Sequence, residues 1–108
     1  MEKIKVIIKR PDEEYGHTTW ISNTLKNLQN IVEGHIETVM LLPDRDLMMI
    51  CNEDGKNIGL DRNFQIGFAP FQETIVGTVI ICGSDGEEFG DIPISMKEWK
   101  QILHLWGN

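Results

Sequence analysis

Apolar positions along the chain fall into short runs that are separated by polar, turn-forming residues. The first run, residues 4–10, is rich in β-branched side chains and alternates in part, which predicts a strand. Pro11 ends this strand because a proline nitrogen cannot donate a hydrogen bond to a neighbouring strand. Residues 12–19 are mostly polar, and we expect them to form a loop.

The next apolar residues recur at the spacing of one helix face: Ile21, Leu25, Leu28, Ile31 and Val32. A helix is therefore predicted here, with Ser22 or Asn23 as its N-terminal cap and Gly34 at its end. Short polar side chains satisfy the free amides at the start of a helix. Glycine adopts the left-handed conformation that often ends one.

A hairpin is predicted after this helix. Residues 35–41 alternate between polar and apolar, residues 47–51 are apolar, and a turn-forming segment with a proline separates them. Residues 61–72 combine phenylalanines with Gly67 and Pro70, so a short strand and an irregular loop fit this segment equally well.

The most apolar segment, residues 74–82, predicts a central strand that is covered on both faces. Gly77 within it indicates a bulge or a close approach of another segment. Residues 83–86 predict a turn, and residues 87–92 predict a short acidic edge strand.

A C-terminal helix is predicted from about Met96. Ser95 and Glu98 have the spacing of a capping box, in which each side chain bonds the backbone amide of the other residue. The apolar residues that follow lie on one helix face: Met96, Trp99, Ile102, Leu103 and Trp106.

This order of elements separates the helices from a run of strands and predicts a single α+β domain over residues 1–108. We expect a mostly antiparallel sheet of about five strands and two helices, one between the first strand and the hairpin and one at the C-terminus. With helices on one face, the other face is solvated or paired in a homodimer or higher homo-oligomer. Trp20, Trp99 and Trp106 are candidates for such an interface, although core packing is the favoured interpretation for Trp99.

Composition narrows the class of protein. The chain has 17 acidic and 10 basic residues and a net charge of -7, which disfavours direct binding to nucleic acid because phosphates are repelled. No apolar run has the length of a membrane span, and the N-terminus lacks the pattern of a signal peptide, so we expect a soluble protein of the cytoplasm. Cys51 and Cys82 fall in separate predicted strands and are interpreted as buried free thiols, with a disulfide as the less favoured alternative.

Known catalytic and metal-binding patterns are missing from the sequence. His17, His35 and His104 lie far apart and have no partner at metal-ligand spacing, and no nucleophile motif surrounds any of the few serines. The glycines lack the context of a phosphate-binding loop and are interpreted as turn residues. We therefore predict no catalytic residue, no metal and no cofactor.

Charged residues form two kinds of cluster. The acidic residues gather in residues 12–14 and in residues 85–91, where they either solvate a sheet edge or dock on a basic partner. Basic residues flank predicted strand ends and loops: Lys9, Arg10, Lys56 and Arg62. If these ends converge, they form a basic pocket for a small phosphorylated ligand, and otherwise they are scattered surface charge.

The most informative segment is residues 52–60, which is dense in polar and turn-forming side chains and lies between two apolar runs. Asparagine, aspartate and glycine allow a sharp turn, so this segment can leave a strand and display Glu53, Lys56 and Asn57 on a rim. We expect a binding site here.

The sequence also resembles a known family in several blocks: Leu25, Leu28-Gln29, Val32, Gly34 and Ile36-Glu37, then residues 50–56, Gly59-Leu60, Asn63 and residues 75–78. These blocks resemble domain-of-unknown-function family 3846, whose members are typically small proteins of bacterial phages and mobile elements. The resemblance covers residues 4–83, so the C-terminal helix is expected to be particular to this chain. In the family a proline commonly follows the Gly-Leu pair, whereas Asp61 stands here.

The resemblance implies an accessory protein of a phage or mobile element that counters host defence. The leading hypothesis is sequestration, without catalysis, of a nucleotide-derived immune signal such as a cyclic nucleotide or an ADP-ribose derivative in the cytoplasm of the bacterial host. The candidate ligand-binding residues are Asn52, Glu53, Lys56, Asn57, Arg62 and Asn63, with Arg10 and Trp20 as outer candidates.

Several alternatives stay open. Glu53 suits ribose hydroxyls, Lys56 and Arg62 suit phosphate, but Asn52 and Asn63 serve equally well as internal braces of the loop. The alternative function is an acidic inhibitor of a host defence nuclease such as a CRISPR effector. It expects one continuous acidic face, with these members: Glu13, Glu14, Glu87, Glu88 and Asp91. An enzyme that degrades the signal ranks third, since only Glu53 or a histidine is available as a base.

Overall fold

The computed structural model describes residues 2–108 of the chain. In chain order its elements are β1 (Lys3–Lys9), β2 (His17–Ser22), α1 (Leu25–Val32), β3 (Ile36–Leu42), the 3₁₀ turn η1 (Pro43–Arg45), β4 (Leu47–Asn52), β5 (Arg62–Ile66), β6 (Glu73–Val76), β7 (Val79–Ser84), β8 (Phe89–Gly90) and α2 (Met96–Leu105). None of the helices in this described part is long and apolar enough to cross a membrane.

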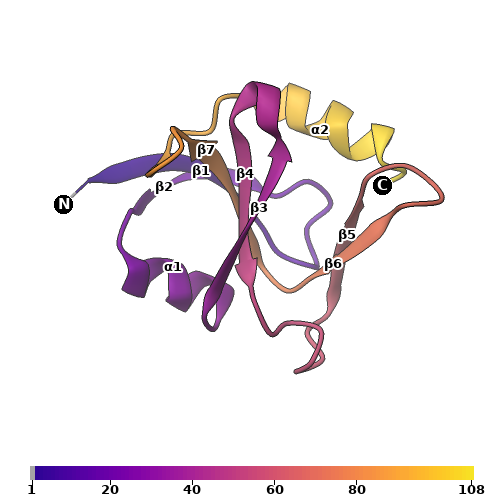
Figure 1. Ribbon diagram of the computed structural model, residues 1–108, viewed down its shortest axis with the longest axis horizontal. Coiled ribbons are helices and arrows are strands. Elements are labelled where there is room, and N and C mark those ends of the chain that lie inside the picture. Colours follow the sequence, from indigo (N-terminus) through magenta and orange to yellow (C-terminus); the bar gives the residue numbers. More distant parts are fainter. Residues whose placement is uncertain (1) are drawn as a thin grey trace.

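The strands form two sheets. The larger sheet has six strands in the order β2-β1-β7-β4-β3, with β8 paired to β7, and every pair in it is antiparallel. The smaller sheet is the antiparallel hairpin of β5 and β6, which projects to one side of the larger sheet (Figure 1). The predicted α+β class, the mostly antiparallel sheet and the positions of both helices are confirmed.

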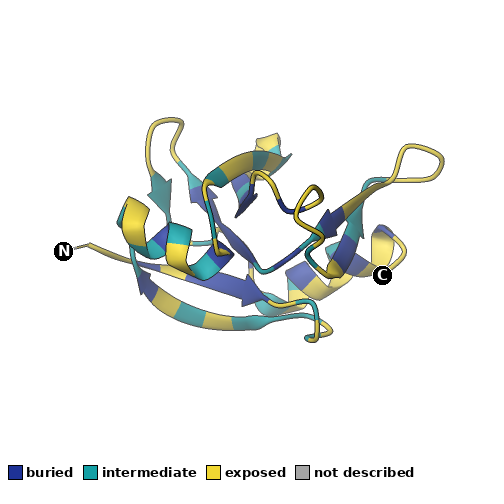
Figure 2. Cartoon of the chain, turned by 90° about the horizontal axis from the view of Figure 1, so that it is seen from below, coloured by how far each residue is buried: buried dark blue, intermediate teal, exposed yellow. Residues whose placement is uncertain are grey.

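Both faces of the larger sheet are covered, so the expectation that helices cover only one face is wrong. Alternate residues of β7 divide between two cores: Ile80 and Cys82 pack toward α1, whereas Val79 and Ile81 pack toward α2 and the β5–β6 hairpin. Side chains point alternately to the two faces of a strand, so one apolar strand supplies both cores. Figure 2 shows the buried residues concentrated in the strands and the exposed ones in loops and on outer helix faces.

The N-terminal third differs from the prediction. Residues from His17 onward form β2 rather than a loop and a helix start, because β2 pairs with β1 from Lys3 opposite Ser22 to Ile8 opposite His17. Helix α1 consequently starts three residues beyond Ser22. Its cap is Thr24, whose hydroxyl accepts from the Asn27 amide at 3.3 Å, and not Ser22 or Asn23.

The predicted central strand over residues 74–82 is two strands. Gly77 adopts a positive φ of 76°, which breaks the run, so β6 pairs with β5 and only β7 lies in the middle of the larger sheet. A side chain at Gly77 would be strained and would lie 2.7 Å from Leu60 Cδ1. The predicted close approach at Gly77 is therefore confirmed, and it determines where the hairpin leaves the sheet.

The C-terminal helix has the predicted capping box between Ser95 and Glu98. Trp99 is fully buried and packs edge-to-face against Phe64 and Trp106, so core packing is the correct interpretation for it. Trp20 lies on the outer strand β2 and is 58% exposed. Cys51 and Cys82 are buried free thiols.

Candidate ligand-binding pocket

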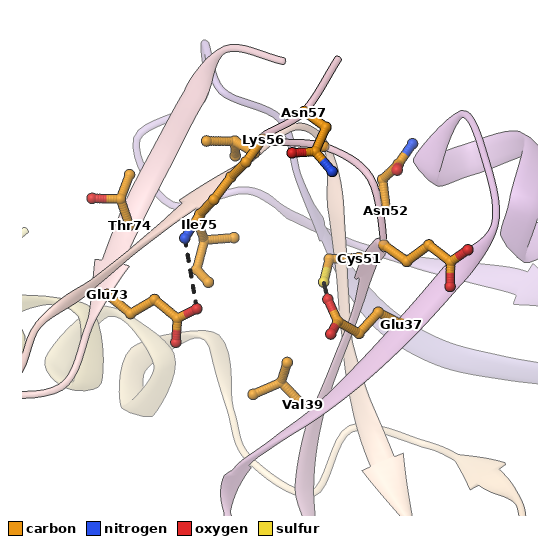
Figure 3. Close-up of a pocket in the computed structure, with 12 residues that line it drawn as sticks. Glu37, Val39, Cys51, Asn52, Lys56, Asn57, Glu73, Thr74 and Ile75 are labelled. Carbon is orange, nitrogen blue, oxygen red and sulfur yellow. Dashed lines mark hydrogen bonds and ion pairs between the residues drawn. The ribbon is translucent and has the colours of Figure 1, made fainter. Parts of the chain in front are cut away.

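The segment after Cys51 lines a pocket of about 310 Å³ between the larger sheet and the hairpin. Its walls come from β3, β4, the loop that follows β4, and β6. The lining residues are Glu37, Val39, Cys51, Asn52, Glu53, Gly55, Lys56, Asn57 and residues 73–76. Figure 3 shows Val39 and Ile75 directed into the space between the two sheets.

Asn52 anchors the loop to the helical side of the molecule. Its amide nitrogen donates to the carbonyl oxygens of Val32 at 3.1 Å and Glu33 at 3.2 Å. Its side-chain oxygen accepts from the Asp54 amide at 2.7 Å, so both polar atoms of this buried side chain are used internally. Asn52 is thus a brace that sets the direction in which the chain leaves β4, and it has no free group for a ligand.

The tip of the loop is held by its own backbone. The Leu60 amide donates to the Gly55 carbonyl and the Ile58 amide to that of Asp54, both at 3.0 Å. Asn57 donates to the Asp54 carboxylate at 3.2 Å and stays exposed. These turns present Lys56 and Asn57 on the pocket rim, as the sequence predicts for this segment.

Lys56 reaches across the pocket mouth to β6. Its ammonium lies 3.7 Å from the Glu73 carboxylate, and both side chains are 61% exposed (Figure 3). An exposed pair at this distance is weak, so a ligand that offers a better partner can separate it. Lys56 is the one cation among the residues that line this pocket, beside the three glutamates Glu37, Glu53 and Glu73.

Cys51 faces Glu37 inside the pocket. The thiol lies 3.9 Å from the Glu37 carboxylate (Figure 3). Burial, with a further contribution from the Glu37 charge, raises the pKa of Cys51 to about 11. The thiol therefore stays protonated near neutral pH, which makes it a poor nucleophile and a weak hydrogen-bond donor.

Asn63 belongs to a different region. Its amide nitrogen donates to the carbonyl oxygens of Lys9 and Gly77, each at 2.8 Å, and its side-chain oxygen accepts from the Lys9 ammonium. Lys9 is 2% exposed, and burial is the main cause that lowers its pKa, assisted by the nearby Arg62 charge. We call these three residues, Lys9, Asn63 and Gly77, the Asn63 brace.

The remaining predicted site residues do not join Lys56. Arg62 lines a shallow hollow of about 520 Å³ beside the Asn63 brace, together with the acidic residues 12–14. Arg10 pairs with Glu13 at 3.5 Å, and Trp20 lies outside both hollows. The predicted basic residues therefore divide between two places, and neither hollow is basic overall.

The acidic residues also divide. Residues 12–14 follow the C-terminal end of β1, whereas residues 85–88 follow the C-terminal end of β7. Because β1 and β7 are antiparallel, with Lys9 opposite Val79, these two groups lie at opposite ends of the pair. The structure does not place them on one continuous face.

Sequence reasoning missed the pocket walls supplied by Glu37, Val39, Cys51 and residues 73–76. These residues read as ordinary strand positions. They come together because the chain breaks at Gly77, so that β6 lies outside the larger sheet and faces β3 and β4. Apart from the glycine itself, no residue near this position in the sequence indicates the break.

Fold and site together describe a small α+β domain with an open pocket of net negative charge between a six-stranded sheet and a hairpin. Comparison with family models gives a match over residues 4–104 to a domain of unknown function, DUF3846. The chain belongs to this family. The match extends into α2, so the expectation that the C-terminal helix is particular to this chain is wrong. Comparisons with curated proteins and with solved structures found no match.

Proposed function

We propose that this protein binds a nucleotide-derived small molecule in the pocket beside Lys56 and withholds it from other proteins without changing it chemically. The observation that carries the proposal is the pocket itself. It combines an apolar wall of Val39, Ile75 and Val76 with carboxylates and one displaceable lysine at the mouth. Apolar pockets with a few convergent polar groups are typical of small-molecule sites.

The charges restrict the ligand. Three glutamates against one lysine disfavour a polyanion, because each phosphate beyond the first would face uncompensated carboxylates. Carboxylates are good acceptors for ribose hydroxyls, and an apolar wall suits a base. A ligand with one phosphate, such as a cyclic mononucleotide, therefore fits better than a doubly charged ADP-ribose derivative.

One observation supports binding without a covalent reaction of the ligand with a thiol. Cys51 is the thiol that lines the pocket, and its raised pKa keeps it protonated and therefore a poor nucleophile. Sequestration of an immune signal by a phage or mobile-element protein remains our hypothesis for the biological role.

Calorimetry and thermal shift with cyclic mononucleotides, ADP-ribose and unphosphorylated nucleosides test the proposal. A ligand that binds the folded state raises its apparent stability. We expect stabilisation by a cyclic mononucleotide that Lys56→Ala weakens by about tenfold in Kd and that Lys26→Ala, an exposed lysine on α1, leaves unchanged. No stabilisation by any member of the panel would refute the proposal.

A further inference from the structure

A second feature of the molecule is the free edge of β3. This strand is the last in the larger sheet and pairs only with β4 among the described residues. It is seven residues long and contains no proline, glycine, lysine or arginine. Natural proteins usually protect such edges with these residues, with β-bulges or with a covering segment, because an open edge is a template for another strand. The pairing of β3 with β4 is regular from Ile36 to Met40 and shifts register between Met40 and Leu42, so the regular, open part of the edge is Ile36 to Met40.

An apolar hollow of about 360 Å³ lies beside the C-terminal half of this edge. Its floor includes Leu41, Leu42, Ile66 and Trp106, which also pack against the core beneath. Its outer wall is the turn between β5 and β6, which projects at one end of the molecule and is largely exposed (Figures 1 and 2). The turn presents Phe68 and Phe71 to solvent.

Exposure of these side chains is unusual for their size. Phe71 is 88% exposed, Phe68 is 62% exposed and Met40, on β3, is 40% exposed. The turn is ordered by a hydrogen bond from the Phe71 amide to the Phe68 carbonyl at 2.8 Å. Clustered exposed apolar side chains around a hollow are typical of surfaces that bind another molecule.

The apolar hollow and the acidic pocket are two ends of one trough along β3. Glu73 lines both of them, and β3 supplies the wall of each: Glu37 and Val39 at one end, Leu41 and Leu42 at the other. The trough therefore changes from apolar to acidic along the direction from the C-terminal to the N-terminal end of β3.

We propose that this trough binds an extended peptide of a partner protein, which adds to β3 as a further antiparallel strand and places an apolar side chain beside Phe71 and a basic one beside Glu37. Neighbouring strands of the larger sheet are all antiparallel, so the added strand runs from the Leu42 end to the Ile36 end. Main-chain hydrogen bonds supply affinity in this mode, and alternate side chains supply specificity.

The spacing of the recognised residues follows from the pleat. Glu37 and Val39 are at alternate positions in the regular part of β3 and line the trough, whereas the register shifts between Met40 and Leu42, where Met40, Leu41 and Leu42 all line the apolar hollow. Side chains of an added strand that face the same way are also two positions apart. The peptide therefore has lysine or arginine opposite Glu37, an apolar residue opposite Val39 two positions before it, and a further apolar residue at the Leu41–Leu42 end of the strand.

A second copy of this chain fits the trough less well. In a two-fold pairing of β3 with itself centred on Val39, each Glu37 would lie opposite the apolar Leu41 of the other copy. A pairing centred on Glu37 would place the two carboxylates together. Both arrangements leave acidic groups without partners, and each chain already carries a net charge of -7, whereas a basic peptide neutralises the acidic end.

The proposal is tested with the full chain and a fluorescent heptapeptide, Thr-Leu-Thr-Val-Thr-Lys-Thr. Fluorescence anisotropy measures its Kd, and amide chemical shifts locate it. We expect the largest shift changes in residues 36–42. Replacing lysine by glutamate in the peptide should weaken binding by about tenfold, and reversing its sequence should weaken it as well, because the basic residue then meets the apolar end.

Protein variants distinguish the apolar end of the trough from the nucleotide pocket, with which the trough shares Glu37, Val39 and Glu73. Phe71→Ser is expected to weaken peptide binding by about tenfold or more, since it removes an apolar contact from a side chain that is 88% exposed and that the fold does not need. Leu25→Ser, at an exposed position of α1 on the other side of the sheet, is the matched control and should change nothing. Phe71→Ser should also leave cyclic mononucleotide binding unchanged.

Four results would overturn the proposal. One is the absence of peptide binding at millimolar concentration, and another is shift changes confined to residues outside β3 and the hairpin. The third is a wild-type dimer in sedimentation equilibrium that Phe71→Ser dissociates, which would make a second copy the occupant of the trough. Equal weakening by Leu25→Ser would show that the effect of Phe71→Ser is not local.

Discussion

The Asn63 brace and the loop around Lys56 contain similar residues, asparagine and lysine, but use them in opposite ways. In the Asn63 brace the polar atoms of Asn63 are all bonded to protein groups, and its lysine, Lys9, is almost fully buried. In the loop, Lys56 and Asn57 are exposed, and Lys56 has only one weak partner. Burial therefore separates residues that build the fold from residues that are available to a ligand.

This difference teaches how to interpret polar residues in a turn. A buried amide must satisfy its hydrogen bonds inside the protein, because an unpaired polar group out of water costs free energy. An exposed amide or ammonium keeps its bonds to water and exchanges them for a ligand at small cost. Substitutions in the two regions are therefore expected to change different properties, stability at the buried residues and binding at the exposed ones.

The largest effect is expected for Asn63→Leu, which keeps the approximate size of the side chain. It leaves the carbonyl oxygens of Lys9 and Gly77 without their Asn63 donor, and it leaves the buried Lys9 ammonium with the Glu13 carbonyl, at 2.8 Å, as its remaining acceptor. We expect a loss of about 3 kcal/mol or more in the free energy of unfolding, measured in urea. A loss below about 1 kcal/mol would show that the brace is dispensable and would break the comparison.

Asn52→Leu should have the second largest effect on stability. It removes the donor to the Val32 and Glu33 carbonyls and the acceptor for the Asp54 amide, but these partners are all uncharged backbone groups, whereas Asn63 also bonds a buried ammonium. We expect a loss of about 2 kcal/mol in the same urea experiment. Nucleotide binding that survives in the folded fraction of this variant would agree with a bracing role, whereas selective loss of binding at unchanged stability would make Asn52 a ligand contact.

The two thiols extend the comparison to pH. Burial raises the pKa of Cys82 to about 12 from an ordinary value of 9.0, so the folded state holds this proton above the pH at which the unfolded chain releases it. The stabilisation that comes from this raised pKa is complete below pH 9 and is lost as the pH rises toward 12. Between pH 8 and pH 10 the wild type should lose about 1 kcal/mol more stability than Cys82→Ala.

Chemical unfolding at the two pH values measures this difference, and comparison with the variant removes the titration of all other groups. Cys51, whose pKa is raised to about 11 and which lines the pocket, changes stability in the same direction. Parallel pH profiles for the wild type and Cys82→Ala would contradict the assignment of the effect to burial of this thiol.

The smallest effect on stability is expected for Lys56→Ala. The ion pair with Glu73 is exposed, so its loss should change the free energy of unfolding by less than about 0.5 kcal/mol. The same variant is expected to lose nucleotide affinity. Stability would then depend on the Asn63 brace and binding on the loop around Lys56. A large loss of stability would instead place Lys56 among the bracing residues.

Elements that depend on neighbouring residues can be recognised in the amino-acid sequence. The β-branched run before Pro11 is β1, the Ser95–Glu98 pattern caps α2, and the polar segment after Cys51 is a turn that presents Lys56. Helix caps, strand propensity and turns follow from contacts within a few positions, so they are visible in the local order of residues.

The remaining elements and the roles of the site residues depend on contacts between distant segments of the chain. The polar segment His17–Ser22 is a strand because β1 supplies its hydrogen-bond partners, and the run around Gly77 is divided because Leu60 fills the space beside it. The same long-range contacts made Asn63 a brace rather than a ligand contact and brought Glu73 to the pocket that Lys56 lines. These features are built by residues that lie far apart in the chain. A polar group becomes buried only when those residues pack together, and burial decides whether the group is free to bind a ligand.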